Sequence, residues 1–443
     1  MTKSVAFYTL GCKVNQYESE RMESAFMDAG YEIKTHGEPA DVYVVNTCTV
    51  TRLAERKSRQ FMRRAKRQNP SAIVAAVGCY PKINPDEVQG IEEVDIVLDN
   101  EHKHQIVELV EACMKNRQMQ MAGLAGGLPC DDFQQETMRQ AEHRTRSMIK
   151  IQDGCDRFCS YCVIPYARGA VHSRPVADIE KEALELVGHG ARELVLTGIN
   201  TALYGKDFGT ESDGIIDVVS RLNRIPGDFR IRLGSLEPTV VDAAYVERLL
   251  EFEKLCHHLH LSLQSGSDRI LKEMRRRYTV EEYMDIVRTV RRHDPHYAIT
   301  TDVIAGFPGE SDSDFQETVD VIKAAGFLKV HAFPYSKRPL TDAASALEQV
   351  PSQVKKQRVK LLSEVADSAS QAYIESLSGL ALRVLPEEIA ERRPGGIIWK
   401  GREDRYVAVY ATSPNDDMPD GFQTITAGNS YADGLFERQE EIE

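Results

Sequence analysis

The sequence predicts an α/β protein of three consecutive modules: a doubly wound parallel sheet, a partial (β/α)6 barrel and a small antiparallel β barrel. Three observations support this prediction. Strand-like apolar runs alternate with helical patterns over residues 1–120, the alternation recurs six times over residues 141–374, and residues 375–443 change to short alternating runs. With 443 residues, the chain is long enough for two or three domains.

The first module contains four apolar runs that are typical of strands. They are, in order, "VAFYTL", "DVYVVNT", "AIVAAVG" and "VDIVLDN". Two helical patterns lie between them: "ERMESAFMDAGY", which ends at Gly30, and the basic "RKSRQFMRRAKRQNP", which ends at Pro70. Nearly continuous β-branched runs separated by helices predict a parallel sheet with helices on both faces. A polar, turn-rich stretch at about 121–146 predicts a linker.

The second module repeats the alternation of strand and helix more regularly. Its strand candidates are "SMIKIQDG", "ELVLTG", "RIRLGS", "HHLHLSL", "YAITTDVIAGF" and "LKVHAFPYS". Six successive βα units predict a partial barrel of parallel strands, short of the eight units of a full (β/α)8 barrel. A long amphipathic helix at about 351–377 closes the module.

The third module has a different pattern. Residues in "IIWKGREDRYVAVYA" and "FQTITAGNSYADGLFERQ" alternate between apolar and polar, with turn residues at short intervals. This pattern predicts a small antiparallel β barrel.

Composition restricts the location and the partners of the chain. No run of 18 apolar residues exists and the N-terminus does not resemble a signal peptide, so we expect an intracellular, cytoplasmic protein. In that reducing environment, nine cysteines indicate metal ligands or catalytic groups before disulfides. The net charge of -13 means that a polyanionic partner would need a local basic patch.

Three cysteines form a compact CxxxCxxC motif directly after the first strand of the second module. They are Cys155, Cys159 and Cys162. A zinc site would need a fourth ligand, which the neighbouring sequence does not offer. Three thiolates can instead hold an iron–sulfur cluster with one iron left open. The alternative, a loop with coincidental thiols, is disfavoured by the compact spacing.

Three further cysteines share one position in successive units of the first module. Cys12, Cys48 and Cys79 each lie just past the carboxyl end of a predicted strand, 36 and 31 residues apart. Parallel strands end at one edge of the sheet, so these thiols could converge there as a second three-thiolate site. Taken singly, each would more often be a small apolar filler.

At these motifs the chain resembles a known family. CxxxCxxC with an aromatic residue, Tyr161, before the last cysteine resembles the radical S-adenosylmethionine enzymes. The two cysteine triads and the order of modules are similar to the methylthiotransferase branch of that family. The motifs that match are "LGCKVN", "VVNTCTVT", "VGCYP", "IQDGCDRFCSYCVIPYARG", "GSLEP", "LSLQSGS" and "TDVIAGFPGE". "LGCKVN" resembles in particular the subgroup that acts on N6-threonylcarbamoyladenosine beside the tRNA anticodon.

The resemblance implies a two-cluster mechanism. Each triad would hold a 4Fe–4S cluster. One S-adenosylmethionine would methylate a sulfur at the first cluster, and a second would be cleaved at the other to a radical that removes hydrogen from carbon 2 of the adenine. The cofactor carries the hard chemistry, so no side chain need act as a catalytic base. The implied partners are the tRNA anticodon arm, an electron donor and a sulfur donor, and the third module occupies the place of the family's TRAM module.

Three alternatives to this function stay open. Within the same branch, the substrate could be an isopentenyl-modified tRNA adenosine or an aspartate of a ribosomal protein. From a different class, the chain could be an RNA-binding or redox-sensing protein with non-catalytic clusters.

For S-adenosylmethionine, the resemblance points to strand ends of the second module. Gly198 in "LTGIN" would let the backbone approach the cofactor, Glu237 in "GSLEP" would bind ribose hydroxyls, and Gln264 in "LSLQSGS" ends the next strand. Tyr161 joins this cofactor-binding set. Each could instead be an ordinary turn or cap residue.

Two basic patches are candidates for binding RNA. The helix from Arg52 to Arg67 holds eight basic residues and one acid, Glu55, although such a run is often only a solvated face. The candidate contacts are Lys57, Arg63, Arg64, Arg67, Arg275, Arg276 and Arg277. From Leu380 onward, seven basic residues stand against thirteen acids, which argues against a broad RNA contact there.

The remaining cysteines and histidines give no motif. We interpret Cys256 as a core residue, Cys113 and Cys130 as incidental, and the histidines of "CHHLH" as strand packing and not as a metal site.

Overall fold

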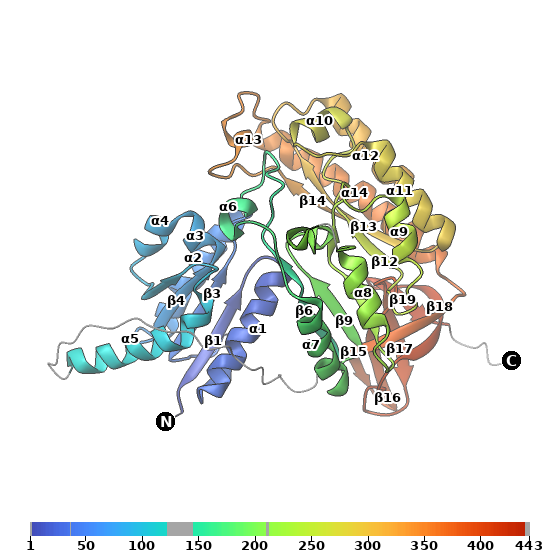
Figure 1. The fold of residues 1–443 in the computed structure, drawn as a ribbon. Coiled ribbons are helices and arrows are strands. Elements are labelled where there is room, and N and C mark those ends of the chain that lie inside the picture. The colour runs from blue at the N-terminus through green and yellow to red at the C-terminus, as the bar shows by residue number, and fades with distance from the viewer. Residues whose placement is uncertain (1, 36, 122–144, 210–211, 439–443) are drawn as a thin grey trace. The chain divides into compact units, whose positions relative to one another are not determined.

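The computed structural model describes residues 2–35, 37–121, 145–209 and 212–438 (Figure 1). Most of the predicted linker, and Cys130, lie outside the described residues. The chain divides into two compact units. Unit 1 comprises Met1–Glu142, Gly154–Ala170 and Ser336–Ala344, and unit 2 comprises His143–Asp153, Val171–Tyr335 and Ser345–Glu443. The three-module division of the sequence stays a prediction.

Unit 1 contains a five-stranded parallel sheet, which confirms the predicted sheet type. Its strand order is β2-β1-β3-β4-β5. The strands are β1 (Ser4–Thr9), β2 (Glu32–Lys34), β3 (Val42–Thr47), β4 (Ile73–Gly78) and β5 (Ile96–Leu98). The sequence pattern missed β2, because this edge strand has three residues and none of them is fully buried.

Helices pack on both faces of this sheet. On one face, α1 (Lys13–Asp28) and α5 (Ile106–Met121) share an apolar core with β1, β3 and β4, to which Phe26 and Val110 contribute. On the other face, α2 (Arg52–Gln68) contributes Met62 and Ala65 to a second core. Figure 1 shows α1 and α2 beside these strands. The shorter helices of unit 1 are α3 (Cys79–Ile83), α4 (Pro85–Gln89), η1 (Lys103–Gln105) and α6 (Ile164–Arg168), with α13 (Asp342–Ser345) at its last segment.

Unit 2 contains all six strand candidates of the central region in two parallel sheets. One sheet has the order β10-β9-β6 and the other β11-β12-β13-β14. The strands are β6 (Arg146–Lys150), β9 (Glu193–Thr197), β10 (Arg230–Leu233), β11 (Ser235–Leu236), β12 (His258–Leu261), β13 (Ala298–Ala305) and β14 (Lys329–Pro334), with a short antiparallel pair β7 (Gln152–Asp153) and β8 (His172–Ser173). The candidate "RIRLGS" is divided at Gly234, where an added Cβ would lie 3.0 Å from the Leu196 carbonyl oxygen.

The helices of unit 2 bury one large apolar core against these strands. They are α7 (Val176–Gly188), α8 (Ile215–Asn223), α9 (Ala243–Leu249), α10 (Asp268–Glu273), α11 (Val280–His293), α12 (Asp312–Ala325) and α14 (Ser352–Ser376), with η2 (Thr201–Leu203) and η3 (Lys206–Phe208). Capping boxes fix two helix starts, at Thr279 with Glu282 and at Ser311 with Asp314. The long predicted helix is confirmed as α14. No helix among the described residues combines the length and apolarity needed to cross a membrane.

Five C-terminal strands close on themselves in the order β15-β16-β17-β19-β18. They are β15 (Ala381–Arg393), β16 (Gly396–Glu403), β17 (Ala408–Ser413), β18 (Gln423–Tyr431) and β19 (Gly434–Glu437). Trp399 is 1% exposed and shares an apolar core with Tyr373 and Leu377 at the end of α14. The predicted antiparallel pairing is found at every pair except β17 with β19, which is parallel.

A buried ion cluster joins the parallel strands of unit 2 to these C-terminal strands. Glu193 on β9 is 0% exposed and accepts hydrogen bonds from three arginines on neighbouring strands. The distances to its carboxylate oxygens are 2.9 Å from Arg146 Nε, 2.6 Å from Arg230 Nη2 and 2.8 Å from Arg232 Nε. Arg230 also contacts Asp404, at 2.8 Å. The cluster is therefore a charged link between two parts of unit 2.

Candidate functional site

Three cysteines lie at the ends of three adjacent strands, as predicted: Cys12, Cys48 and Cys79, called the first triad below. Cys12 caps the start of α1 directly after β1, Cys48 follows β3, and Cys79 begins α3 directly after β4. In the sheet, β3 lies between β1 and β4, and the strands are parallel. Their carboxyl ends therefore present the three thiols at one edge of the sheet.

Close approach brings the first two cysteines together. Gly11 has φ +101°, and a Cβ added there would lie 2.9 Å from Cys48 Sγ, so a side chain is excluded on two grounds. Asn15, which is buried, donates to the carbonyl oxygens of Leu10 at 2.7 Å and Thr47 at 2.9 Å. The backbones before Cys12 and Cys48 are thus held by one amide.

The protonation of these thiols reflects burial and mutual proximity. Burial raises the pKa of the Cys48 thiol to about 12, and the charges of Cys79 and Cys12 add to that effect. Desolvation also raises the pKa of Cys12, whereas the charge of Arg168 opposes the shift. The charge of Cys79 raises the pKa of both Cys12 and Cys48, so these thiols lie close enough to interact electrostatically.

The second triad, which comprises Cys155, Cys159 and Cys162, lies in the segment of unit 1 that spans residues 154–170. The loop is closed at its ends, since the Cys155 N–H donates to the Gly169 carbonyl oxygen at 3.0 Å. Gly154 has φ +70°, and any Cβ there would collide with the Ala170 carbonyl oxygen. Inside the loop, the Cys162 N–H donates to the Cys159 carbonyl oxygen at 2.9 Å, and the half-buried Tyr161 lies between these cysteines.

Neither cysteine triad among the described residues brings its three sulfurs as close together as one tetrahedral metal ion requires. Tetrahedral thiolates about 2.3 Å from one zinc ion would lie about 3.8 Å apart. Within the described ranges, only His260, Asp302 and His331 form a group of three potential ligands whose ligand atoms all lie within 4.8 Å of one another. Both cysteine triads are therefore too open for one ion, and their three-thiolate sets suit an iron–sulfur cluster.

Two buried cations lie beside the first triad. The side chains of Arg168 and Lys103 are 1% and 7% exposed, and both pair with Glu18. Arg168 Nη1 lies 3.0 Å from Glu18 Oε1, and Lys103 Nζ lies 2.6 Å from Glu18 Oε2. Arg168 Nη2 also donates to Asn15 Oδ1 at 2.6 Å. Sequence reasoning missed this group, although Arg168 belongs to the "PYARG" run that follows Cys162.

Asn100 connects Cys79 to the loop of the second triad. Its Nδ2 lies 3.5 Å from Cys79 Sγ and donates to the Ala167 carbonyl oxygen at 2.8 Å. Within unit 1, the residues around one triad are thus hydrogen-bonded to the segment that carries the other.

A cavity of about 350 Å³ opens beside the first turn of α2, in unit 1. Arg52 and Lys337 line it, together with a buried ion pair between Arg338 and Glu55. Thr49, the residue after Cys48, donates to Glu55 Oε1 at 2.7 Å. The lining carries both signs of charge, since Glu87 also faces the cavity, and Thr49 links it in sequence to Cys48.

The three predicted cofactor residues of unit 2 lie at or just past strand ends, and Glu237 is part of a polar network with Asn200 and Gln152. A Cβ at Gly198 would lie 3.2 Å from the Gln152 carbonyl oxygen, which explains the glycine. Glu237 is 3% exposed and accepts a hydrogen bond from Asn200 Nδ2 at 2.6 Å. The Asn200 N–H in turn donates to Gln152 Oε1 at 3.1 Å. Gln264 has φ +65°, and its N–H donates to the Asp302 carbonyl oxygen at 2.8 Å.

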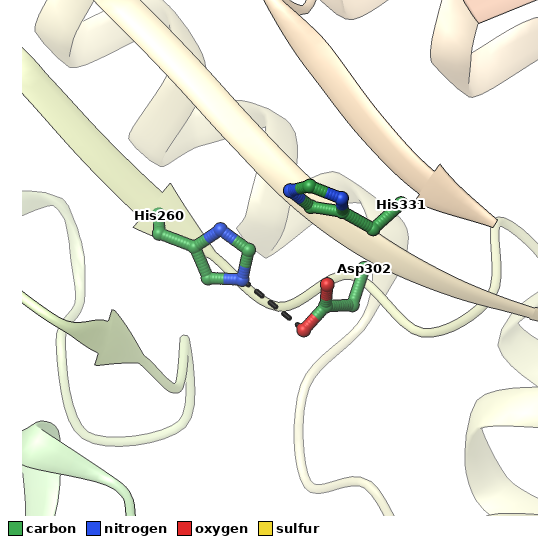
Figure 2. Close-up of side chains that lie close together, drawn as sticks. All are labelled: His260, Asp302 and His331. Atoms are coloured by element: carbon green, nitrogen blue, oxygen red, sulfur yellow. Dashed lines mark hydrogen bonds and ion pairs between the residues drawn. The ribbon is translucent and has the colours of Figure 1, made fainter. Parts of the chain in front are cut away.

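Figure 2 shows a polar cluster on three neighbouring strands of unit 2: His260 on β12, Asp302 on β13 and His331 on β14. His260 Nε2 lies 3.2 Å from Asp302 Oδ2, and its Nδ1 lies 2.9 Å from Thr300 Oγ1. Desolvation disfavours the carboxylate of Asp302, but the hydrogen bond and charge of His260 and the charge of His331 hold its pKa below the ordinary value. The interpretation of "CHHLH" as strand packing is thus incomplete, because His260 is part of an ion pair.

The predicted RNA-contact residues differ in exposure. On α2, Lys57, Arg63, Arg64 and Arg67 are exposed, as are Arg275 and Arg277 in unit 2. Arg276 has a side chain that is 7% exposed and pairs with Glu237 at 3.2 Å. Because its guanidinium is buried in this ion pair, Arg276 is not available to bind RNA, and the prediction for Arg276 was wrong. The prediction stands only for its exposed neighbours, Arg275 and Arg277. Cys256 is buried as expected, and Cys113, a residue of α5, packs against the apolar core on that face of the sheet.

Comparison with known proteins gives matches over nearly the whole chain. Residues 149–322 match the radical SAM superfamily, and residues 4–99 match an uncharacterised protein family, UPF0004. The threonylcarbamoyladenosine tRNA methylthiotransferase MtaB of Bacillus subtilis is 38% identical over 99% of this chain and 98% of its own. Its counterpart in Aquifex aeolicus is 40% identical over 86% and 92%. A tRNA-2-methylthio-N(6)-dimethylallyladenosine synthase of Pelotomaculum thermopropionicum is 33% identical over 93% of each chain.

Among solved structures, the fold is similar to the radical S-adenosylmethionine methyltransferase TsrM of Kitasatospora setae. The TM-score is 0.56, with 15% identity over 78% of this chain and 77% of that chain. At this identity the likeness concerns the fold alone.

Proposed function

Because the chain belongs to the family of radical S-adenosylmethionine tRNA methylthiotransferases, we propose that it adds a methylthio group to carbon 2 of N6-threonylcarbamoyladenosine beside the tRNA anticodon. The family uses S-adenosylmethionine and 4Fe–4S clusters. The observation that carries the proposal is that both sets of three free cysteines belong to one compact unit. The choice of adenosine follows the relatives: those named for threonylcarbamoyladenosine are 36–40% identical, and those named for dimethylallyladenosine 32–34%.

In this proposal each triad holds one of two 4Fe–4S clusters. Cys12, Cys48 and Cys79 hold the first, and Cys155, Cys159 and Cys162 hold the second. When bound, the clusters and S-adenosylmethionine supply the sulfur, the methyl group and the one-electron chemistry. The chain itself leaves one coordination position open at each triad, because neither offers a fourth thiolate.

The chain's own residues bind and orient the cofactor. Asn200 and Arg276 hold the carboxylate of Glu237 in place, so it can accept hydrogen bonds from ribose hydroxyls without reorganising. Gly198 and Gln264 supply backbone at strand ends, and Tyr161 supplies an aromatic side chain next to Cys162. The target adenosine leaves its stack to reach the site.

The architecture supports the same proposal. We infer that the two parallel sheets of unit 2 form the partial (β/α)6 barrel of residues 141–374, and that residues 375–443 form a TRAM-like module after the methylthiotransferase module of residues 1–120. The protein would act in the cytoplasm with separate, unidentified electron and sulfur donors. The closed C-terminal strands and the six-strand alternation support this assignment.

Nucleoside mass spectrometry of tRNA tests the proposed substrate. In cells that lack this gene, we expect methylthio-threonylcarbamoyladenosine to disappear and its precursor to accumulate. The wild-type gene should restore the product, and a gene with Cys79→Ala should not. Loss of the methylthio-dimethylallyl nucleoside instead would favour the second group of relatives. Unchanged tRNA would contradict both and direct attention to the ribosomal-protein aspartate or to a non-catalytic role.

Reversing charges on α2 should weaken tRNA binding. In the variant Arg63→Glu, Arg64→Glu, Arg67→Glu we expect at least a tenfold higher Kd at low salt. The slope of log K against log salt should flatten by about 0.7 for each phosphate that the variant no longer neutralises, because fewer counterions are released. Filter binding over a salt series measures both quantities. Lys360→Glu on α14, whose side chain is 80% exposed, is the matched control and should change little. An unaltered salt slope in the triple variant would remove α2 from the RNA interface.

A further inference from the structure

The first cysteine triad is accompanied by more positive than negative buried charge. Arg168 and Lys103 contribute two cations, and Glu18, which lies between them, contributes one carboxylate. Both cations lie against the triad: Arg168 Nη2 donates to Asn15 Oδ1, three residues after Cys12, and Lys103 Nζ lies 3.3 Å from where a Cβ of Gly78, the residue before Cys79, would be. In a low-dielectric surrounding, this excess charge needs an anionic partner.

The source of the charge is informative. Arg168 is the last residue of α6 and follows the CxxxCxxC motif, yet its guanidinium contacts Asn15 and Glu18 on α1, directly after Cys12. Asn100 fixes the neighbouring backbone at Ala167 and also reaches Cys79 Sγ. The segment that carries the second triad therefore delivers a fixed charge to the first.

Building on the proposed function, we propose that Arg168 and Lys103 set the reduction potential of the cluster held by Cys12, Cys48 and Cys79. Three thiolates give such a cluster a net negative charge, which grows when an electron is added. Fixed cations in a buried site stabilise the more negative state, because Coulomb interactions are stronger there than in water. Arg168 and Lys103 thus act through their fixed charge and raise the potential of this cluster.

An anaerobic redox titration followed by electron paramagnetic resonance tests this proposal. The full-length chain carries Cys155→Ala, Cys159→Ala and Cys162→Ala, so that only the first cluster contributes. With Arg168→Gln, we expect the ratio of reduced to oxidised cluster at a fixed potential to fall about tenfold, which is 59 mV for a one-electron couple. Lys103→Gln should shift the ratio in the same direction, and Arg168→Lys should restore most of the wild-type value. Lys3→Gln, which removes a half-exposed cation of unit 1 that pairs with the half-exposed Glu111 at 3.3 Å, is the control.

The outcomes separate this inference from the proposed function. Iron and sulfide are measured first, and a wild-type triad that binds no cluster would overturn the proposed function itself. An unchanged or higher potential in a fully loaded Arg168→Gln protein overturns the inference alone. If the Arg168→Gln protein loses its iron, the potential of a fully loaded Lys103→Gln protein is measured instead, and an unchanged or higher value again overturns the inference. Loss of iron from both Arg168→Gln and Lys103→Gln would show that the two cations have a purely structural role, and it would also overturn the inference about the reduction potential.

Discussion

Replacing Cys155 with alanine is expected to abolish the reductive cleavage of S-adenosylmethionine, whereas replacing Cys79 should spare that cleavage and abolish methylthio transfer. The reason is the proposed division of labour between the two triads, in which each cluster would depend on all three of its thiolates. Anaerobically reconstituted protein is treated with dithionite, and 5′-deoxyadenosine is quantified by liquid chromatography. Methylthiolated nucleoside is measured in the same samples with tRNA present.

Cys256→Ala serves as the matched control, because Cys256 is a buried core residue outside both triads. It should leave both products near wild-type levels when the protein is folded. Persistence of 5′-deoxyadenosine in Cys155→Ala would contradict the assignment of the second cluster. Its loss in Cys79→Ala, with iron still bound at the second triad, would contradict the independence of the two sites.

Replacing Glu193 with glutamine is expected to lower the free energy of unfolding of unit 2 by about 3–5 kcal/mol, the usual effect of removing one partner from a buried ion pair. Arg146, Arg230 and Arg232 would keep their charges without the carboxylate that all three contact. Denaturant unfolding followed by circular dichroism measures the effect. Glu180→Gln is the control: Glu180 pairs with Arg221, whose side chain is 52% exposed, so its loss should cost at most about 1 kcal/mol.

The same substitution has a predictable pH dependence. Burial disfavours the Glu193 carboxylate, but the charges of Arg232 and Arg230 outweigh it and hold its pKa well below the ordinary value of 4.5. Since the folded-state pKa is depressed, the stabilisation is complete above pH 4.5 and is lost as the pH falls below it. The difference between wild type and Glu193→Gln should therefore narrow on acidification. A difference that widens in acid would show that Glu193 is not ionised in the fold.

Sequence patterns predicted most of the framework because apolar periodicity and strand-end placement are local properties. The six strands of the central region and the three strand-end cysteines follow directly from such patterns. The pattern could not find β2, a three-residue edge strand with little burial. It also could not show that β17 pairs in parallel with β19, because strand direction depends on the path of the intervening chain.

The charged surroundings of the site were beyond sequence reasoning for another reason. Glu18, Lys103 and Arg168 are single charges far apart in the chain, and only the fold brings them together. Arg276 shows a second kind of error, in which the local composition suggested a role that the fold does not allow. It stands in a run of three arginines that suggested RNA, yet it pairs with a buried glutamate, while its two neighbours remain exposed. A basic run indicates charge and does not indicate which way each side chain points.

The division of unit 1 into three separate stretches of chain has a consequence for biogenesis. The ribosome releases Cys12 early, but the stretch Ser336–Ala344, which supplies Arg338 to the buried pair with Glu55 and backbone to Ser160, emerges only near the end of synthesis. At roughly 5–20 residues per second, that delay is on the order of ten seconds or more after Cys162 appears. The fold of unit 1 is therefore completed late, and under the proposed function the six thiols of the two triads would have to stay reduced for at least that long.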